Sequence, residues 1–290
     1  MEFGMDPTKS LRKLLDACEA GPLMVHSDVL RASRFVPEYR GKRQSLEDHY
    51  QILRTVAGER PIWMPTFNYE FTSRGEFDVT NSQSQVGALT RHFRKEHANW
   101  RTAVPVFSFA GTGQCPSLGR ETPVQPFGPN SVFATLLKRN GTILFYGAPF
   151  TSVTFVHHTE HICQPVYRYD KCFRGNVIQD GISKDVTVEF HVRPLGVSVE
   201  YDFNRMLQDL YDIGIDKYLN GDDPAVIVAN AREVNEFWQR RIRQDPFYLL
   251  KTSCRSALEQ KYAELGRRFQ VSDFETNSKP WPVRADSRTA

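Results

Sequence analysis

The run Thr142-Ile-Leu-Phe-Tyr-Gly147, followed shortly by Thr154-Phe-Val-His-His-Thr-Glu-His161, decides how the chain is expected to fold. The first run is apolar and predicts a buried strand that ends in a glycine turn. The second run holds three of the eight histidines and predicts a helix whose first threonine caps it. Residues three and four apart are neighbours on a helix, so His157, Glu160 and His161 are expected to share one face. The pattern indicates reactive side chains at a sheet edge.

Length and composition are those of a globular protein with a sizeable core. The chain has 290 residues, of which 40% are hydrophobic and 12% aromatic, and its formal net charge of +3 is too small to indicate nucleic-acid binding. No apolar run reaches the roughly 18 residues of a membrane span. The charged first 19 residues lack the apolar core of a secretory signal. We expect a soluble, cytoplasmic protein with neither nucleic acid nor membrane as a partner.

The cysteines support the same expectation. There are five, at positions 18, 115, 163, 172 and 254, and no two of them form a Cys-x-x-Cys pair. An odd and scattered set does not indicate a disulfide framework or a zinc finger. A reducing compartment is therefore expected.

Strand and helix patterns alternate over the first 160 residues and then change character. Buried strands are predicted at 22–26, 61–65, 104–110 and 142–147, and helices at 8–19, 44–56, 86–96 and 131–138. Residues 165–177 and 186–199 alternate in polarity around Asp180-Gly181, which predicts a β-hairpin. Helices follow at 203–211, 224–243 and 253–269.

These patterns predict an α/β fold, with a central mixed sheet flanked by helices and an antiparallel β-hairpin addition. We expect a single domain over residues 1–270, with the hairpin inserted at about 164–200, and a polar C-terminal tail over 271–290. The polar residues Ser27 and Asp28 follow the first strand, where an open α/β sheet binds ligands. The alternative is that they only cap a following helix.

Six short segments occur in a definite order along residues 22–160. They are Val25-His26-Ser27-Asp28-Val29-Leu30, Met64-Pro65-Thr66-Phe67, Ser84-Gln-Val-Gly87-Ala88-Leu89, Pro105-Val-Phe-Ser108-Phe109-Ala110, Phe127-Gly128-Pro129-x-Ser131 and Thr154-x-x-His157-x-x-Glu160. Each segment alone is a weak signal. The ordered set resembles the aminoglycoside 3-N-acetyltransferase, or antibiotic N-acetyltransferase, family, and the resemblance implies the fold of that family.

The resemblance also implies an activity, namely direct transfer of an acetyl group from acetyl-CoA to an amino group of an aminoglycoside or related amino sugar. The resemblance therefore also implies a role in antibiotic resistance. A histidine starts near the pKa that suits a general base at neutral pH, and a carboxylate on its other ring nitrogen would fix the tautomer. We expect His157 to be the base and Glu160 its orienting partner, with Asp202 as a second candidate acid.

Binding residues follow from the same segments. The resemblance implies a site for acetyl-CoA at His26, Ser27, Asp28, Val29, Leu30, Arg31, Ser108 and Phe109. It implies an acceptor site at Thr66, Tyr69, Glu70 and Thr154. A helix beginning after His26 would offer free N–H groups to the phosphates of CoA. Arg31 and Arg34 would either offset the charge of Asp28 there or be surface charges. Ser108, or backbone N–H groups near Ser27 and Asp28, would stabilise negative charge on the thioester oxygen.

Three positions depart from the family pattern, and they leave other functions open. Asp28, Val104 and Val153 stand where the family usually has serine, histidine and asparagine. Such a chain could acylate a nucleotide-linked amino sugar in glycan synthesis, or could bind a sugar or CoA without catalysis. The sequence names neither the acceptor nor the oligomeric state, so a homodimer stays open.

A zinc metallohydrolase is the alternative from another class. His157-His-Thr-Glu-His161 fits the His-x-x-Glu-His motif, in which both outer histidines bind zinc and Glu160 acts as the base. Glu233 or Glu236 would supply the third ligand. This motif explains nothing before residue 157, whereas the acyltransferase interpretation explains six segments and requires no metal.

Overall fold

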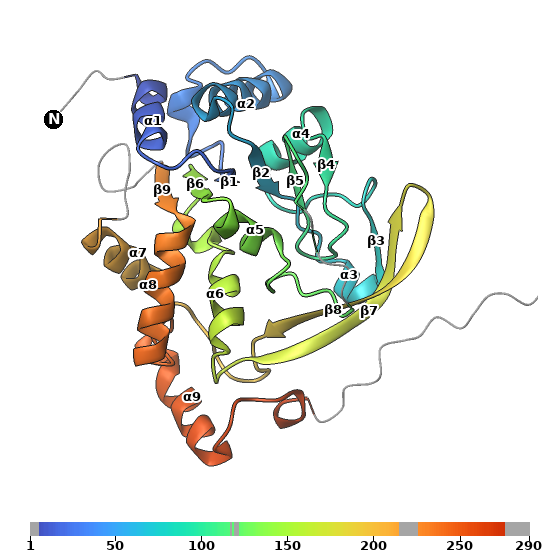
Figure 1. Ribbon diagram of the computed structural model, residues 1–290, viewed down its shortest axis with the longest axis vertical. Coiled ribbons are helices and arrows are strands. Elements are labelled where there is room, and N and C mark those ends of the chain that lie inside the picture. Colours follow the sequence, from blue (N-terminus) through green and yellow to red (C-terminus); the bar gives the residue numbers. More distant parts are fainter. Residues whose placement is uncertain (1–5, 117, 119–121, 215–225, 276–290) are drawn as a thin grey trace, which may run out of the picture.

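The computed structural model describes residues 6–116, 118, 122–214 and 226–275. Within these ranges the chain is organised around a mixed sheet (Figure 1). The six strands described for this sheet follow the order β4 (Trp100–Arg101), β5 (Phe109–Gly111), β2 (Ile62–Pro65), β1 (Leu23–Ser27), β6 (Thr142–Tyr146) and β9 (Val226–Asn230). β1 is parallel to β2 and β6, whereas β5 and β9 run antiparallel to their neighbours. The predicted central mixed sheet is confirmed.

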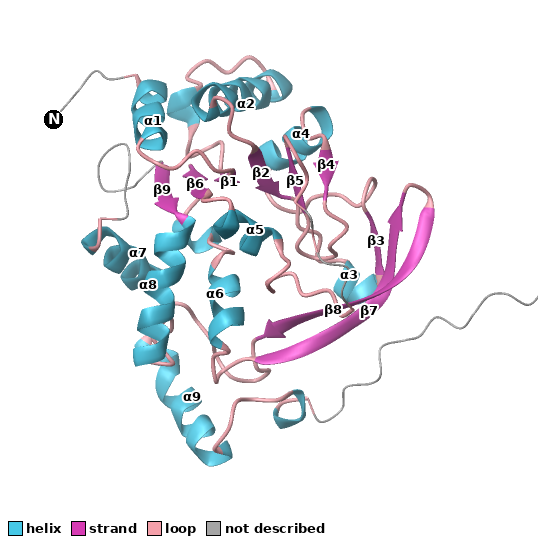
Figure 2. Cartoon of the chain, in the orientation of Figure 1, coloured by secondary structure: helices cyan, strands magenta, loops and turns pink. Residues whose placement is uncertain are grey.

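Helices cover both faces of this sheet (Figure 2). One face packs against α1 (Pro7–Asp16), α2 (Lys42–Ala57) and α4 (Ala88–Glu96). The other packs against α5 (Val132–Lys138), α6 (Val156–Cys163), α7 (Phe203–Asp212) and α8 (Ala231–Gln244). Successive side chains of a strand point to opposite faces, so Leu144 and Tyr146 of β6 join the first core while Ile143 and Phe145 join the second.

The predicted hairpin is present as a long, curved ribbon. β7 (Tyr169–Gln179) and β8 (Ile182–Val192) pair along their whole length around the two-residue turn Asp180-Gly181. Both turn residues have positive φ, 51° and 75°, as a type I′ hairpin turn requires. In Figure 1 the hairpin runs from the end of α6 past α3 (Phe71–Arg74) to β3 (Glu76–Asp78), which pairs in parallel with β7.

The remaining elements are short or peripheral. In the described part of the chain, short 3₁₀ helices lie at η1 (Ser33–Phe35), η2 (Phe150–Ser152) and η3 (Val271–Asp273). α9 (Thr252–Leu265) packs its apolar face near the start of the hairpin. The predicted tail begins with η3, and its residues 276–290 lie outside the described part of the chain. Among the described residues, no helix combines the length and apolar character needed to cross a membrane.

Several sequence predictions were wrong in detail. The predicted strand 104–110 is reduced to β5, which begins only at Phe109. The predicted helix 224–243 is β9 followed by α8, while its first two residues lie outside the described ranges. Asn230 makes the boundary, because its side-chain oxygen accepts the N–H groups of Arg232 and Glu233 at 2.9 and 3.2 Å. The predicted cap of α6 was also wrong. That helix begins after Phe155, and the hydroxyl of Thr154 donates to the carbonyl of Ser152 at 3.3 Å.

Candidate active site

A cleft of about 1210 Å³ lies at the carboxyl ends of β1 and β6. Most of its lining comes from residues 26–30, 148–149, 151–154, 190–193 and 199–204, together with His157. The cleft therefore lies where an open α/β sheet binds ligands. The end of β8 and the segment after it form part of its wall, so the hairpin contributes to the site as well as to the fold.

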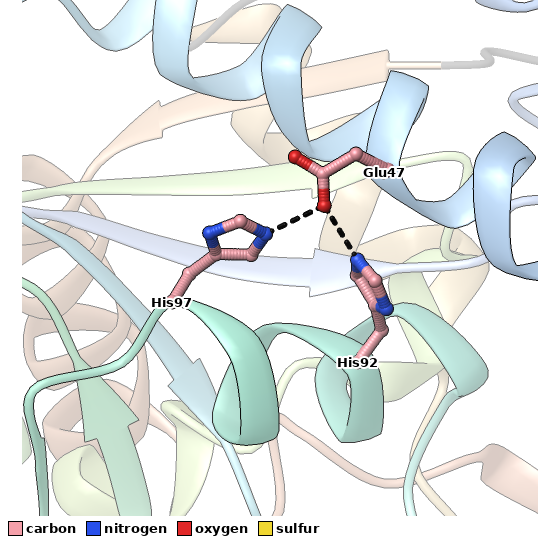
Figure 3. Close-up of side chains that lie close together, drawn as sticks. All are labelled: Glu47, His92 and His97. Carbon is pink, nitrogen blue, oxygen red and sulfur yellow. Dashed lines mark hydrogen bonds and ion pairs between the residues drawn. The ribbon is translucent and has the colours of Figure 1, made fainter.

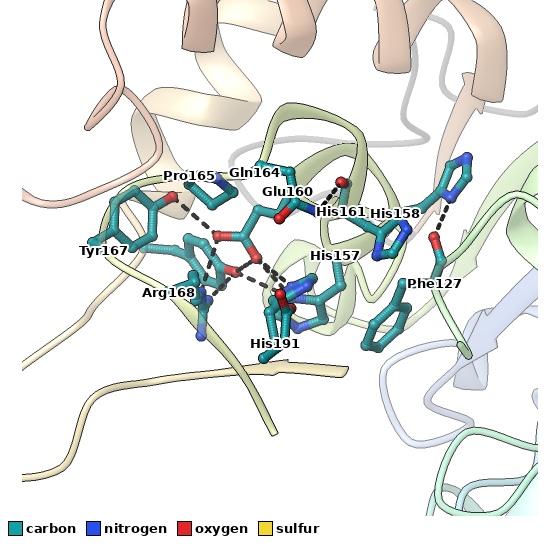
Figure 4. Close-up of polar contacts among 12 residues, drawn as sticks. Phe127, His157, His158, Glu160, His161, Gln164, Pro165, Tyr167, Arg168 and His191 are labelled. Atoms are coloured by element: carbon teal, nitrogen blue, oxygen red, sulfur yellow. Dashed lines mark hydrogen bonds and ion pairs between the residues drawn. The ribbon is translucent and has the colours of Figure 1, made fainter. Parts of the chain in front are cut away.

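His157 presents its imidazole to this cleft from the first turn of α6. Its Nδ1 donates a hydrogen bond to Oε2 of Glu160, 2.9 Å away, and the two side chains point toward one another (Figure 4). The pair is three residues apart on the helix, as the sequence predicts. The side chain of His157 is 26% exposed, and its ring packs against Phe127 at 5.1 Å between centroids. With Nδ1 held by the carboxylate, Nε2 is the ring nitrogen left to accept a proton.

Glu160 is fully buried, and four further groups donate to its carboxylate. Oε1 accepts from the hydroxyl of Tyr167 at 3.0 Å and from Nε of Arg168 at 3.2 Å. Oε2 accepts from the hydroxyl of Tyr201 at 2.6 Å and from Nε2 of His191 at 3.1 Å. These donors compensate for the loss of water around the charge and fix the direction of the carboxylate.

The electrostatics keep the carboxylate charged and the imidazole neutral. Burial alone would raise the pKa of Glu160, but the charge of Arg168 and the hydrogen bonds from His157 and His191 hold that pKa well below its usual range. Burial lowers the pKa of His157, and Glu160 offsets part of the effect. A neutral imidazole oriented by a carboxylate can accept a proton at neutral pH.

Five of the eight residues predicted for acetyl-CoA line the cleft: His26, Ser27, Asp28, Val29 and Leu30. His26 is buried, and burial lowers its pKa to about 4. Its Nε2 has no hydrogen-bond partner among the described residues. Arg31 is exposed and is not among the residues that line the cleft.

Ser108, Phe109 and Thr66 are fully buried beside the cleft rather than in its lining. The hydroxyls of Thr66 and Ser108 lie 2.9 Å apart, and Arg101 donates to both. Phe109 belongs to the core on the α5 side of the sheet. In this conformation the three side chains support the cleft wall and do not line the cleft.

The helix expected after His26 is replaced by a turn. The backbone N–H of Asp28 donates to the carbonyl of Tyr146 at 2.9 Å, and Oδ1 of Asp28 accepts the N–H of Leu30 at 3.0 Å. Gly147 makes this close approach possible, because its φ is +72° and a Cβ there would lie 2.1 Å from the Asp28 carbonyl oxygen. The expected phosphate site at a helix N-terminus was therefore wrong, and Asp28 N–H is not free to stabilise an oxyanion.

Some of the residues predicted to bind the acceptor line the cleft, and others do not. Tyr69 and Thr154 line the cleft, and Tyr69 is 48% exposed. Glu70 lies outside the lining, where it pairs with Arg74 at 2.8 Å. Tyr69 and Thr154 are thus placed where they can meet an acceptor.

Asp202 lines the cleft but has a structural role already. Its carboxylate caps α7 by accepting the N–H of Arg205 at 3.1 Å. Among the described contacts, His157 is oriented by Glu160 and Tyr201 and not by Asp202.

The predicted metal ligands do not come together as the His-x-x-Glu-His motif requires. The described residues that gather around Glu160 with potential ligand atoms are His157 and His191, without His161. Arg168 also occupies one carboxylate oxygen, and its positive charge would repel a cation at this place. The geometry does not support the motif's ligand set.

The sequence patterns did not predict that His191, Tyr201, Tyr167 and Arg168 would contact Glu160. Tyr201 also lies 3.2 Å from Nδ1 of His157 and accepts a hydrogen bond from Arg168. Tyr167 and Arg168 lie shortly after α6, and this Tyr-Arg pair following the histidine helix was a usable signal. Nothing in the local sequence of β8 indicated that His191 faces Glu160.

Comparison with known proteins adds to this geometry. Three solved structures with the same fold are AAC(3)-IVa as the apoenzyme (20% identity, TM-score 0.65, 89% of this chain and 99% of that one), AAC-IIIb in a binary complex with CoASH (19%, 0.64, 82% and 96%) and YokD from Bacillus subtilis (17%, 0.60, 80% and 97%). No curated protein sequence matches the chain significantly. The family model for aminoglycoside 3-N-acetyltransferase matches residues 24–243. The predicted resemblance is confirmed, and the chain belongs to the aminoglycoside 3-N-acetyltransferase family of acyltransferases.

Proposed function

We propose that this protein transfers an acetyl group from acetyl-CoA directly to an amino group of an aminoglycoside or a related amino sugar. Family membership supports the class of reaction. The observation that carries the proposal is the His157–Glu160 hydrogen bond of 2.9 Å at the wall of a cleft large enough for two substrates. The five free cysteines fit a reducing compartment such as the cytoplasm.

The chemistry requires a base more than a nucleophile. A thioester is already activated, but an amine that carries a proton cannot attack it. In the proposed step, Nε2 of His157 takes a proton from the ammonium group, and the amine nitrogen attacks the thioester carbonyl. The carbon–sulfur bond then breaks, the nitrogen loses its second proton, and that proton converts the departing CoA thiolate to the thiol. The imidazolium of His157 returns its proton to solvent, so one proton is released per transfer. Glu160 stabilises the imidazolium that forms while holding Nδ1–H in place.

The charges of the cleft fit both substrates. Asp28, Glu200 and Asp202 line it and would attract the ammonium groups of an aminoglycoside. Arg193 and Lys251 also line it and are the candidates for the phosphates of CoA, now that no helix begins after His26. Solved relatives bind comparable ligands, since AAC(3)-IVa has been seen with apramycin and AAC-VIa with sisomicin.

A transfer assay with purified protein tests the proposal. Acetyl-CoA is incubated with aminoglycosides, a simple hexosamine or a nucleotide-linked amino sugar, while thiol release and the mass of the acceptor are followed. We expect thiol release together with a single added acetyl group on an aminoglycoside. Acetylation of the nucleotide-linked sugar alone would change the acceptor class. No acetylation of any amine by folded protein would overturn the proposal.

A further inference from the structure

A second group of metal-ligating side chains lies away from the cleft, between α2 and α4. Glu47 comes from α2, His92 from α4, and His97 from the residue that ends α4. Oε2 of Glu47 lies 2.9 Å from Nε2 of His92 and 2.7 Å from Nε2 of His97 (Figure 3). The three ligand atoms all lie within 4.8 Å of one another. Two imidazoles and one carboxylate thus converge on a single point.

Neighbouring contacts hold these side chains in place. The other oxygen of Glu47 accepts a hydrogen bond from Gln51 at 2.6 Å, which leaves Oε2 turned to the histidines. The ring of His97 stacks on Tyr50 with 3.7 Å between centroids. The side chain of His92 is 7% exposed, that of His97 20% and that of Glu47 29%. Outer contacts of this kind orient metal ligands and raise affinity.

From this convergence we propose that Glu47, His92 and His97 bind one Zn²⁺ ion. Zinc takes imidazole and carboxylate ligands at about 2.0–2.2 Å in a tetrahedral arrangement. Tetrahedral bonds of this length place ligand atoms about 3.3 Å apart, so Oε2 of Glu47 has to move several tenths of an ångström away from the imidazole nitrogens that lie 2.9 and 2.7 Å from it. Each imidazole proton moves from Nε2 to Nδ1. Mg²⁺ and Ca²⁺ are disfavoured because they prefer sets of oxygen ligands.

The surroundings leave room for a fourth ligand. The trio lines a hollow of about 720 Å³ that is open to solvent, so water can complete the tetrahedron. Arg40, Lys42 and Arg43 also line the hollow, and their charge weakens cation binding. The two arginines have carboxylate partners, however, since Arg40 pairs with Asp48 at 2.9 Å and Arg43 with Glu96 at 3.5 Å.

The position of the proposed site indicates what a bound ion would do. It would link α2 to α4, and the residues at the start of α4, Gly87, Ala88 and Thr90, line the catalytic cleft. A metal bound to the folded chain alone stabilises that chain by mass action. The ion would therefore act as a structural clamp on one wall of the cleft, without touching the reacting groups.

The test is calorimetric titration of untagged, metal-stripped protein with Zn²⁺, with elemental analysis of the complex. We expect one equivalent of Zn²⁺ to bind, Mg²⁺ not to bind, and the thermal midpoint to rise with Zn²⁺. Loss of a contact that merely orients a ligand costs about 10–100-fold in affinity, so Glu47→Gln should weaken Zn²⁺ binding by at least about 100-fold. Gln44→Ala is the matched control, because Gln44 lines the same hollow outside the trio and should leave Zn²⁺ affinity unchanged.

The cleft offers a rival ligand set, which the same experiment separates. His157, Glu160 and His191 are also close enough to hold an ion. Zinc affinity that is unchanged in Glu47→Gln but lost in His191→Ala would overturn the proposal, and so would the absence of Zn²⁺ binding by the folded wild type. If Glu47→Gln fails to fold, His92→Gln replaces it, with circular dichroism as the check and the same expected loss of Zn²⁺ binding.

Discussion

Glu160 and Arg168 form an ion pair between two side chains that are almost completely withdrawn from water, with Oε1 of the carboxylate 3.2 Å from Nε of the guanidinium and side-chain exposures of 0% and 3%. Removing one partner of such a pair leaves an uncompensated buried charge, which costs about 3–5 kcal/mol. Arg168→Met should therefore lower the free energy of unfolding by about that amount, as measured by urea denaturation.

An exposed pair supplies the control for this experiment. Arg74 lies 2.8 Å from Glu70, and their side chains are 71% and 42% exposed. Arg74→Met should change the free energy of unfolding by at most about 1 kcal/mol, because water already solvates both charges. Equal losses in the two variants would show that the Arg168 pair has no special structural weight.

Acidification should destabilise the fold through buried histidines. Burial lowers the pKa of His26 and of His191 to about 4, whereas an unfolded histidine titrates near 6.5. Between these values the unfolded chain binds more protons than the native one, so stability is full above pH 6.5 and is lost as the pH falls toward 4. In His26→Leu, the free energy of unfolding measured by urea denaturation should fall less steeply with decreasing pH than it does in wild type. An identical slope would mean that His26 titrates normally in the fold.

Tyr201 should act on the base through its hydroxyl. That group donates to Glu160 at 2.6 Å and lies 3.2 Å from Nδ1 of His157. A hydrogen bond to a charged group contributes about 1.5–3 kcal/mol, so Tyr201→Phe should lower kcat by about 10- to 100-fold if the bond matters most in the transition state. The acid limb of the kcat profile should also shift, because the charge distribution around the imidazole changes. A higher KM with kcat and its pH profile unchanged would instead assign Tyr201 to substrate binding.

Asp202 offers a way to separate capping from catalysis. Asparagine caps a helix about as well as aspartate, whereas alanine loses about 1 kcal/mol of stability. If Asp202 only caps α7, Asp202→Asn should keep both stability and kcat, and Asp202→Ala should lose stability alone. A large loss of kcat in a stable Asp202→Asn protein would restore the expectation that this carboxylate orients the base.

Local patterns predicted much of the fold but not all of its boundaries. The Asp180-Gly181 turn was predictable because a type I′ hairpin needs positive φ at both positions, and it set the register of β7 and β8. β9 was not predicted, since a run of five mostly apolar residues is compatible with a buried strand and with a helix. The capping residue Asn230 was the overlooked signal.

The site residues also divide into those that local sequence patterns predicted and those that depend on long-range contacts. His157 and Glu160 were predictable because both lie on one short helix at a spacing of three. His191 and Tyr201 reach Glu160 only because the hairpin returns β8 to the cleft, which is a long-range relationship that no local period records. The buried positions of Thr66, Ser108 and Phe109 likewise depend on how β2 and β5 pair, so motif matching could not distinguish support of the wall from contact with a ligand.

The proposed transfer depends most directly on His157 as the base. A paired measurement of acetyl-CoA binding and acetyl transfer in wild type and His157→Ala tests this role. The variant should bind acetyl-CoA as tightly as wild type while its kcat falls by about 10²–10⁴-fold, the range that a general base contributes. In wild type, the acid limb of kcat should lie below pH 6.5, because burial lowers the pKa of His157 from that ordinary value. A His157→Ala protein that keeps the kcat and the pH profile of wild type would contradict the role of His157 as the base.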